Sequence, residues 1–296
     1  MDIFENIRLT FRHGSSLIKL IYINTAVFIL VKLLLIIFIL FNFSGNFLLT
    51  YLAIPSDLTM LGQRFWTPIT YMFLHEGVWH FFFNMLTFFW FGKIFLMYFS
   101  EKQLVGLYLI GGLAGALFYV AAYNLFPYFA PELHSSILMG ASGSIMAIIV
   151  ATAFRSPNME LQLLFLGGIK LKFIAVFVVL TSLFGVTSNN GGGEIAHLGG
   201  ALTGYLFFLS LQQGKDMTSG LNRFLDRISD LFHRPKMHVK SNPYAKSKPM
   251  TDAEFNMNKA RNITDIDRIL DKIKSSGYES LSSDEKKRLF DQGNKK

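Results

Sequence analysis

Long apolar runs, separated by short polar segments, occupy the first two thirds of the chain. Six apolar runs are candidate membrane helices, of which the fourth and fifth are short: residues 20–43, 75–99, 103–126, 140–154, 173–187 and 194–212. A helix that crosses a bilayer needs about 20 apolar residues. The first run is too long for the apolar core of a signal peptide, and no small-residue cleavage site follows it, so we expect a retained helix. The pattern predicts an all-α membrane protein with a six-transmembrane helical bundle.

The fourth run is too short to cross a bilayer alone. A helix that begins at Ser142 and ends near Arg155 would begin below the outer surface, at the floor of a cavity. Non-helical backbone at that depth is tolerated only where it is buried in protein or faces water. The start of this helix is therefore predicted to mark a functional site.

Basic residues predict which side of the membrane each loop faces. They precede the first run and follow the second, fourth and sixth runs: Arg8, Arg12, Lys19, Lys102, Arg155, Lys170, Lys172 and Lys215. The segments 127–139 and 188–193 contain no Lys or Arg, and 44–74 contains only Arg64. Because cytoplasmic loops carry the excess of Lys and Arg, we expect both termini in the cytoplasm, in a bacterial inner membrane.

Composition divides the chain into an apolar core and a basic tail. Hydrophobic residues make up 51% of the chain, and its mean hydropathy is +0.37, which is too apolar for a soluble protein of this size. Residues 1–212 carry a net charge of +2, and residues 213–296 carry +6. A basic tail beside a membrane indicates orientation and attraction to lipid more often than nucleic-acid binding. The chain has no cysteine, which excludes disulfides and thiol catalysis.

The tail is predicted to contain two helical parts. Residues 213–250 would form an amphipathic helix (217–232) on the cytoplasmic leaflet, followed by a proline-containing linker (233–250). Residues 251–296 would form a small helical hairpin, broken near Gly277, in which Ser282 and Glu285 make a capping box.

Two features of the first third need a local explanation. Lys32 falls in the middle of the first run, where a charge costs about 3 kcal/mol. We expect it to snorkel or to be buried against a neighbour. The loop 44–74 is aromatic and nearly uncharged, which favours the outer membrane interface.

A serine and a histidine lie at the starts of two predicted helices, both in the outer half of the membrane. Ser142 lies in the run GASG (140–143), and His197 lies in AHLGG (196–200). A serine hydroxyl becomes a nucleophile when a base takes its proton, and histidine is the usual base. The small residues around the pair would let the two helices touch: Gly140, Gly143, Gly200 and Gly204.

Plainer interpretations stay open for each of these residues. The glycines could serve packing alone, with Ser142 as one more small residue. His197 could be a buried histidine whose hydrogen bonds are satisfied. His80 and Asn84 lie four residues apart, on one helical face. Both side chains can donate a hydrogen bond to an oxyanion, as can the N–H groups at a helix start. Asn84 could equally form a hydrogen bond that joins two helices.

No acidic partner for His197 is evident in the sequence. Glu194 lies three residues earlier, at the outer end of the predicted helix, which favours a Ser–His dyad over a triad. Metal binding is the main competing role for the histidines. The spacing of His75 and His80 matches neither an i, i+4 pair nor an HExxH motif, and no carboxylate completes a site. We expect no metal and no cofactor.

Together these segments resemble the rhomboid intramembrane serine proteases over about residues 20–212. The matching pieces are GASG in the fourth run, AHxxGxxxG from Ala196 in the sixth and HxxxxHxxxN from His75 in the second. The resemblance implies a compact helical bundle with a water-filled cavity that opens outward. It implies cleavage of transmembrane substrates near the outer face, with Ser142 as nucleophile and His197 as general base. By the same match, His80 and Asn84 would stabilise the oxyanion.

Two positions depart from the family pattern. The first loop has Arg64 before Phe65 and Trp66, where many members carry Trp-Arg, and Met146 stands where some members have an aromatic residue. A catalytically silent rhomboid-like protein that binds or escorts membrane proteins is the main alternative, and a small transporter or channel is a weaker one. The expected partners are transmembrane protein substrates and the lipid bilayer, with no nucleic acid.

Overall fold

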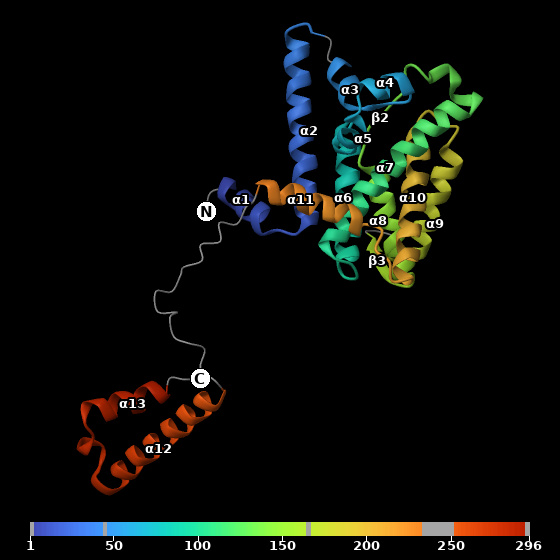
Figure 1. Cartoon of the computed structure of the whole chain (residues 1–296). Coiled ribbons are helices and arrows are strands. Elements are labelled where there is room, and N and C mark those ends of the chain that lie inside the picture. Colours follow the sequence, from blue (N-terminus) through green and yellow to red (C-terminus); the bar gives the residue numbers. More distant parts are fainter. Residues whose placement is uncertain (1–2, 44–45, 164–166, 233–251, 294–296) are drawn as a thin grey trace. The chain divides into compact units, whose positions relative to one another are not determined.

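The computed structural model describes residues 3–43, 46–163, 167–232 and 252–293. The chain divides into two compact units, residues 1–233 and residues 234–296. The first unit contains a bundle of apolar helices (Figure 1). They are α2 (Ser16–Leu40), α6 (Val78–Leu96), α7 (Glu101–Leu125), α8 (Ser142–Arg155), α9 (Leu171–Gly185) and α10 (Gly191–Gln212).

These six helices coincide with the six predicted runs, but they are unequal in length. Within the described residues, three of them are long and apolar enough to cross a membrane: α2, α7 and α10. The apolar helices α8 and α9, with 14 and 15 residues, are shorter. Helix α6 has 19 residues, among them the polar His80, Asn84 and Lys93. The fold is therefore that of a mostly helical membrane protein, and six complete spans remain a prediction.

Helix α8 lies at the centre of the bundle. It begins at Ser142 and ends at Arg155, as predicted, and every residue from 143 to 153 is buried. Helix α10 packs most extensively on α8 and α7. A Cβ atom on Gly200 would lie 2.0 Å from the carbonyl oxygen of Gly143, and one on Gly204 would lie 2.2 Å from that of Ala147. The glycines thus bring the backbones of α8 and α10 into direct contact.

The close contact of α8 and α10 predicts a large effect of adding one methyl group. Gly200→Ala is expected to separate the two helices and to destabilise the bundle by about 1–3 kcal/mol or more. The measurement is thermal unfolding of the purified protein in detergent. Gly220→Ala is the matched control, because no atom lies within 4 Å of the Cβ that it would add. Equal unfolding temperatures for the two variants would contradict this packing.

The first loop folds into short elements near one end of α2, and α1 (Ile3–His13) and α11 (Ser219–Phe232) lie near its other end (Figure 1). The loop elements are α3 (Asn46–Leu52), β1 (Ile54–Pro55), α4 (Leu58–Gln63), α5 (Thr67–Thr70) and η1 (Tyr71–Phe73). Arg64 donates to the carbonyl oxygen of Thr50 at 2.8 Å, and the Trp66 indole donates to that of Tyr51 at 3.0 Å. The altered Arg-Phe-Trp order therefore still braces the loop.

Two small sheets were not predicted. Strand β1 pairs with β2 (Ile137–Leu138), which follows η2 (Pro127–Glu132), and β3 (Glu160–Leu163) pairs with β4 (Gly167–Lys170) between α8 and α9. Such short strands give too little alternation to be seen in the sequence. The fold is thus mostly helical, with a few short strands in addition. The β1–β2 pair ties the first loop to the segment that leads into Ser142.

Lys32 has a structural explanation. Its ammonium group donates to the carbonyl oxygen of Glu76 at 2.5 Å and lies 5.8 Å from the centre of the Phe28 ring. The charge in the middle of α2 is therefore held against a backbone acceptor beside α6, by a side chain that is only partly buried.

The tail contributes helices to both units. Helix α11 belongs to the first unit and lies against α7. The side chain of Thr218, just before α11, would be 2.6 Å from a Cβ atom on Gly106 of α7. Lys102 of α7 forms an ion pair with Asp226 of α11 at 2.7 Å. The predicted linker at 233–250 lies outside the described residues. The second unit comprises α12 (Asp252–Ser276), η3 (Tyr278–Ser280) and α13 (Ser283–Gly293).

The predicted capping box at the start of α13 is confirmed. The backbone N–H of Ser282 donates to the Glu285 carboxylate at 2.7 Å, and the N–H of Glu285 donates to the Ser282 hydroxyl at 3.3 Å. These bonds and the neighbouring Lys272 ammonium lower the pKa of Glu285 to about 2. The cap therefore stays charged at neutral pH.

Candidate active site

Backbone contacts fix the turn that carries Ser142. The N–H of Gly140 donates to the carbonyl oxygen of Tyr71 at 2.9 Å, which attaches the turn to the first loop. Gly140 has a φ of 138°, a conformation that side chains other than glycine rarely adopt. The chain can therefore turn sharply and begin α8 at Ser142, whose backbone N–H is one of the free donors at a helix start.

His80 and Asn84 lie beside this turn, on one face of α6. A Cβ atom on Gly140 would lie 3.1 Å from Cε1 of His80 and 3.6 Å from Oγ of Ser142, so the imidazole and the hydroxyl flank the same glycine. The Asn84 amide is buried and donates to the carbonyl oxygen of His80 at 2.8 Å. One amide N–H of Asn84 is thus used within its own helix, and the other remains for a ligand.

His197 lies in the second turn of α10 and is surrounded on one side by polar groups. Its Nδ1 atom is 3.2 Å from Oε2 of Glu194 and 3.2 Å from Oγ of Ser182 on α9. The sequence analysis set Glu194 aside because of its place at the end of the predicted helix, although its i, i+3 spacing from His197 allows the contact. It missed Ser182, because this contact depends on the packing of α9 against α10.

Two cavities share Ser142, His197, His80 and Asn84 in their walls. The polar cavity, of about 520 Å³, is also lined by residues from the first loop, α7, η2 and the start of α10, including Glu76, Tyr119, Glu132, Ser136 and Asn190. The lateral cavity, of about 480 Å³, lies between α6, α8 and α9 and is lined mainly by apolar side chains, including Trp79, Phe83, Met146, Ile149 and Val178. The four predicted site residues therefore stand where a polar space meets an apolar one.

Ser142 and His197 face the same space without a direct bond. Among the hydrogen bonds of the described residues, none joins the Ser142 hydroxyl to the imidazole. Their helices are nevertheless in backbone contact through two glycines. Gly143 directly follows Ser142, and Gly200 lies one turn after His197. Catalytic hydrogen bonds are often longer without substrate and shorten in the complex. The arrangement is compatible with proton transfer from Oγ to Nε2, the imidazole nitrogen that does not contact Glu194 or Ser182.

His75 is not part of either cavity wall. Its side chain is 2% exposed and packs edge-on against the Phe28 and Phe81 rings. In the described part of the chain, no group of three or more His, Cys, Asp or Glu residues could hold a metal ion. Met146 is buried and lines the lateral cavity at the position where an aromatic residue occurs in some rhomboids.

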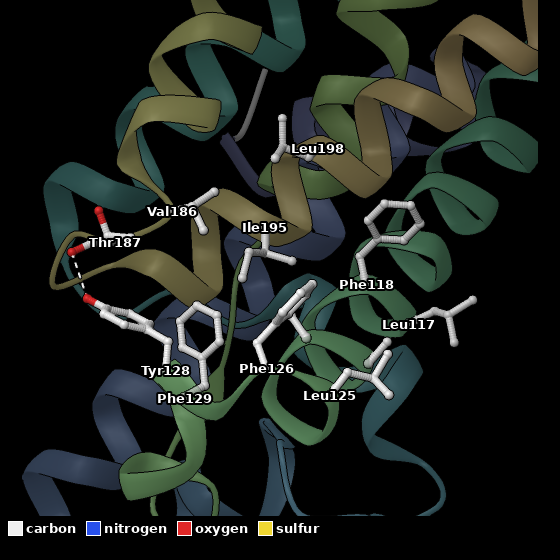
Figure 2. Close-up of a pocket in the computed structure, with 12 residues that line it drawn as sticks. Leu117, Phe118, Leu125, Phe126, Tyr128, Phe129, Val186, Thr187, Ile195 and Leu198 are labelled. Atoms are coloured by element: carbon white, nitrogen blue, oxygen red, sulfur yellow. Dashed lines mark hydrogen bonds between the residues drawn. The ribbon is translucent and has the colours of Figure 1, made fainter.

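A third cavity, of about 690 Å³, has neither Ser142 nor His197 in its lining (Figure 2). It is lined by apolar side chains of α7, η2 and α10, among them Leu117, Phe126 and Ile195. At its edge, the Tyr128 hydroxyl donates to the carbonyl oxygen of Thr187 at 3.0 Å. The cavity contains no nucleophile beside a base, so it is not a candidate for catalysis.

The fold and the site define a multi-pass helical membrane protein with a serine and a histidine at shared cavities. A model of the Rhomboid domain matches residues 62–213, just over half of the chain, and this chain belongs to the rhomboid family. A second model, a family of unknown function (DUF6576), matches residues 250–292. RHOMBOID-like protein 12, mitochondrial, from Arabidopsis thaliana is 26% identical over 182 residues. That match covers 58% of this chain and 54% of the relative, so the chain spans about half of the relative's length.

Proposed function

We propose that this protein is an intramembrane serine endopeptidase that cleaves transmembrane substrates near the outer membrane face. The observation that carries the proposal is the position of Ser142 and His197 at the junction of the polar and lateral cavities. Peptide hydrolysis inside a bilayer needs water on one side of the nucleophile and an apolar route for the substrate on the other. Membership of the rhomboid family, which includes serine proteases, supports the same reaction.

In this proposal Ser142 attacks the scissile carbonyl and His197 takes the hydroxyl proton on Nε2. The Ser142 N–H, His80 and Asn84 stabilise the oxyanion, and the imidazolium then protonates the leaving amine. The lateral cavity would receive an unwound segment of the substrate, and the polar cavity would supply the water. The reaction requires no cofactor, and the partners are transmembrane proteins and lipid.

The orientation follows the charge pattern. Both termini would lie on the more basic side of the membrane, which is the cytoplasmic side under the positive-inside rule. A bacterial inner membrane stays a prediction, because the relative named above is described as mitochondrial.

Cleavage of a transmembrane reporter by the reconstituted protein is the test. The proposal expects one cut near the outer end of the reporter helix. A catalytically silent rhomboid-like protein that binds or escorts membrane proteins remains the second candidate, since the described residues show no Ser142–His197 hydrogen bond. It predicts that the reporter is retained by the protein and stays intact. Binding without cleavage would therefore reject the protease and favour the second candidate.

The oxyanion role of Asn84 gives a separate prediction. Asn84→Ala is expected to lower the cleavage rate by about 10²–10³-fold, the usual effect of losing one oxyanion donor. The measurement is the initial rate on the same reporter. Thr87→Val is the matched control, because Thr87 lines the lateral cavity one turn further along α6. A rate for Asn84→Ala equal to that of the control would leave Asn84 with only a structural role, through its bond to His80 within α6.

A further inference from the structure

We propose that Glu194 is a positioning residue for His197. It would be the third polar residue of the site, beside the proposed catalytic pair Ser142 and His197. This inference rests on the proposed function. The Glu194 carboxylate would hold the imidazole with its proton on Nδ1, so that the lone pair of Nε2 points toward Ser142. It would also stabilise the imidazolium that forms when the serine proton is transferred.

The first observation is the geometry around Nδ1 of His197. Oε2 of Glu194 and Oγ of Ser182 both lie 3.2 Å from this nitrogen. A carboxylate can only accept a hydrogen bond, so Nδ1 must carry the proton in this contact. In a neutral imidazole, Nε2 is then the acceptor, which is the tautomer that a general base needs.

The second observation is that the packing of α9 on α10 fixes the Glu194 side chain. A Cβ atom on Gly185 would lie 2.8 Å from Cγ and 3.1 Å from Cδ of Glu194, so this glycine leaves room for the carboxylate against α9. Ser182, one turn earlier on the same helix, is 2% exposed. The side chains of Glu194 and His197 are each 21% exposed. The contact is therefore partly shielded from water, where a charge interaction is stronger than at the surface.

The proton balance leaves the carboxylate ionised throughout. The Oγ–H proton of Ser142 moves to Nε2 of His197 as the Oγ–carbonyl bond forms. The same proton moves from Nε2 to the leaving nitrogen as the C–N bond breaks. The Nδ1 proton stays on the imidazole, and Glu194 supplies orientation and charge without being protonated.

A structural role for Glu194 is the competing explanation. The residue lies in the first turn of α10, where a negative charge also stabilises the helix dipole. That role predicts a small change in stability, whereas a positioning role predicts a loss of turnover at unchanged substrate binding.

Glu194→Gln separates the two roles because it removes the charge and keeps the volume. We expect kcat to fall about 100-fold, KM to change less than about threefold, and the unfolding temperature to stay close to wild type. Glu160→Gln is the matched control and should retain kcat, because Glu160 lies on β3 and lines neither the polar nor the lateral cavity. A kcat for Glu194→Gln within about twofold of the control would overturn the proposal.

A second measurement does not depend on turnover. In the Ser142→Ala background, ¹⁵N NMR of labelled histidine at pH 8 reports which imidazole nitrogen of His197 carries the proton. We expect the Nδ1–H tautomer with Glu194 present and a shift toward a mixture in Glu194→Leu. An identical tautomer in both proteins would overturn the inference. If the tautomer changes as expected but the wild-type protein cleaves no reporter, the protease is refuted and the positioning of His197 stands.

Discussion

Replacing Ser142 with alanine is expected to abolish cleavage of a transmembrane reporter by the reconstituted protein. The loss should be at least about 10⁴-fold, since knocking out a serine nucleophile removes covalent catalysis and leaves only binding and oxyanion stabilisation. Among the described residues, no hydrogen bond engages the Ser142 hydroxyl. The variant should therefore unfold at the wild-type temperature, and the lost activity should not reflect misfolding.

Ser144→Ala provides the matched control for this change. Ser144 lies two residues along α8, is 1% exposed, and its hydroxyl has no hydrogen-bond partner within the described ranges. Removing an unpaired buried hydroxyl costs little, so this variant should cleave normally. Wild-type cleavage by Ser142→Ala would assign the nucleophile to another residue.

His197→Ala is expected to cause a comparable loss, because a serine without its base is a poor nucleophile. Residues that act as one unit are strongly non-additive. The double variant Ser142→Ala/His197→Ala should therefore be no slower than either single variant. Initial rates for the four proteins give this comparison directly.

His134→Ala is the control for loss of an imidazole. His134 pairs with Asp57 in the loops and lines none of the three cavities described above. Its variant should retain activity. Additive losses in the double variant would show that Ser142 and His197 do not act in one mechanism.

The helices of the core were predictable because each is an apolar run bounded by polar segments. The start of α8 at Ser142 was predictable because Gly140 and Gly143 flank a serine at the edge of a short run. The closeness of α8 and α10 followed from the small residues at Gly200 and Gly204, since such spacing lets backbones touch.

Other features depend on contacts that the sequence does not display. The β1–β2 pair joins residues about 80 positions apart through two residues on each side, which is too short a pattern to detect. The position of Ser182 against His197 arises from the packing of α9 on α10. Glu194 was visible at i, i+3, yet its place at the outer end of the helix suggested exposure. The Glu194 side chain is less exposed than expected, because Gly185 has no side chain and lets the carboxylate lie against α9.

The central claim is that the Ser142 hydroxyl is an activated nucleophile in a cavity that water reaches. Its most direct test is covalent labelling of the reconstituted wild-type protein with a serine-directed phosphonate or isocoumarin, followed by mapping of the modified residue by mass spectrometry. The account predicts one adduct, on Ser142, that is absent after His197→Ala. An adduct on another serine, or no adduct in a protein that still cleaves the reporter, would contradict it.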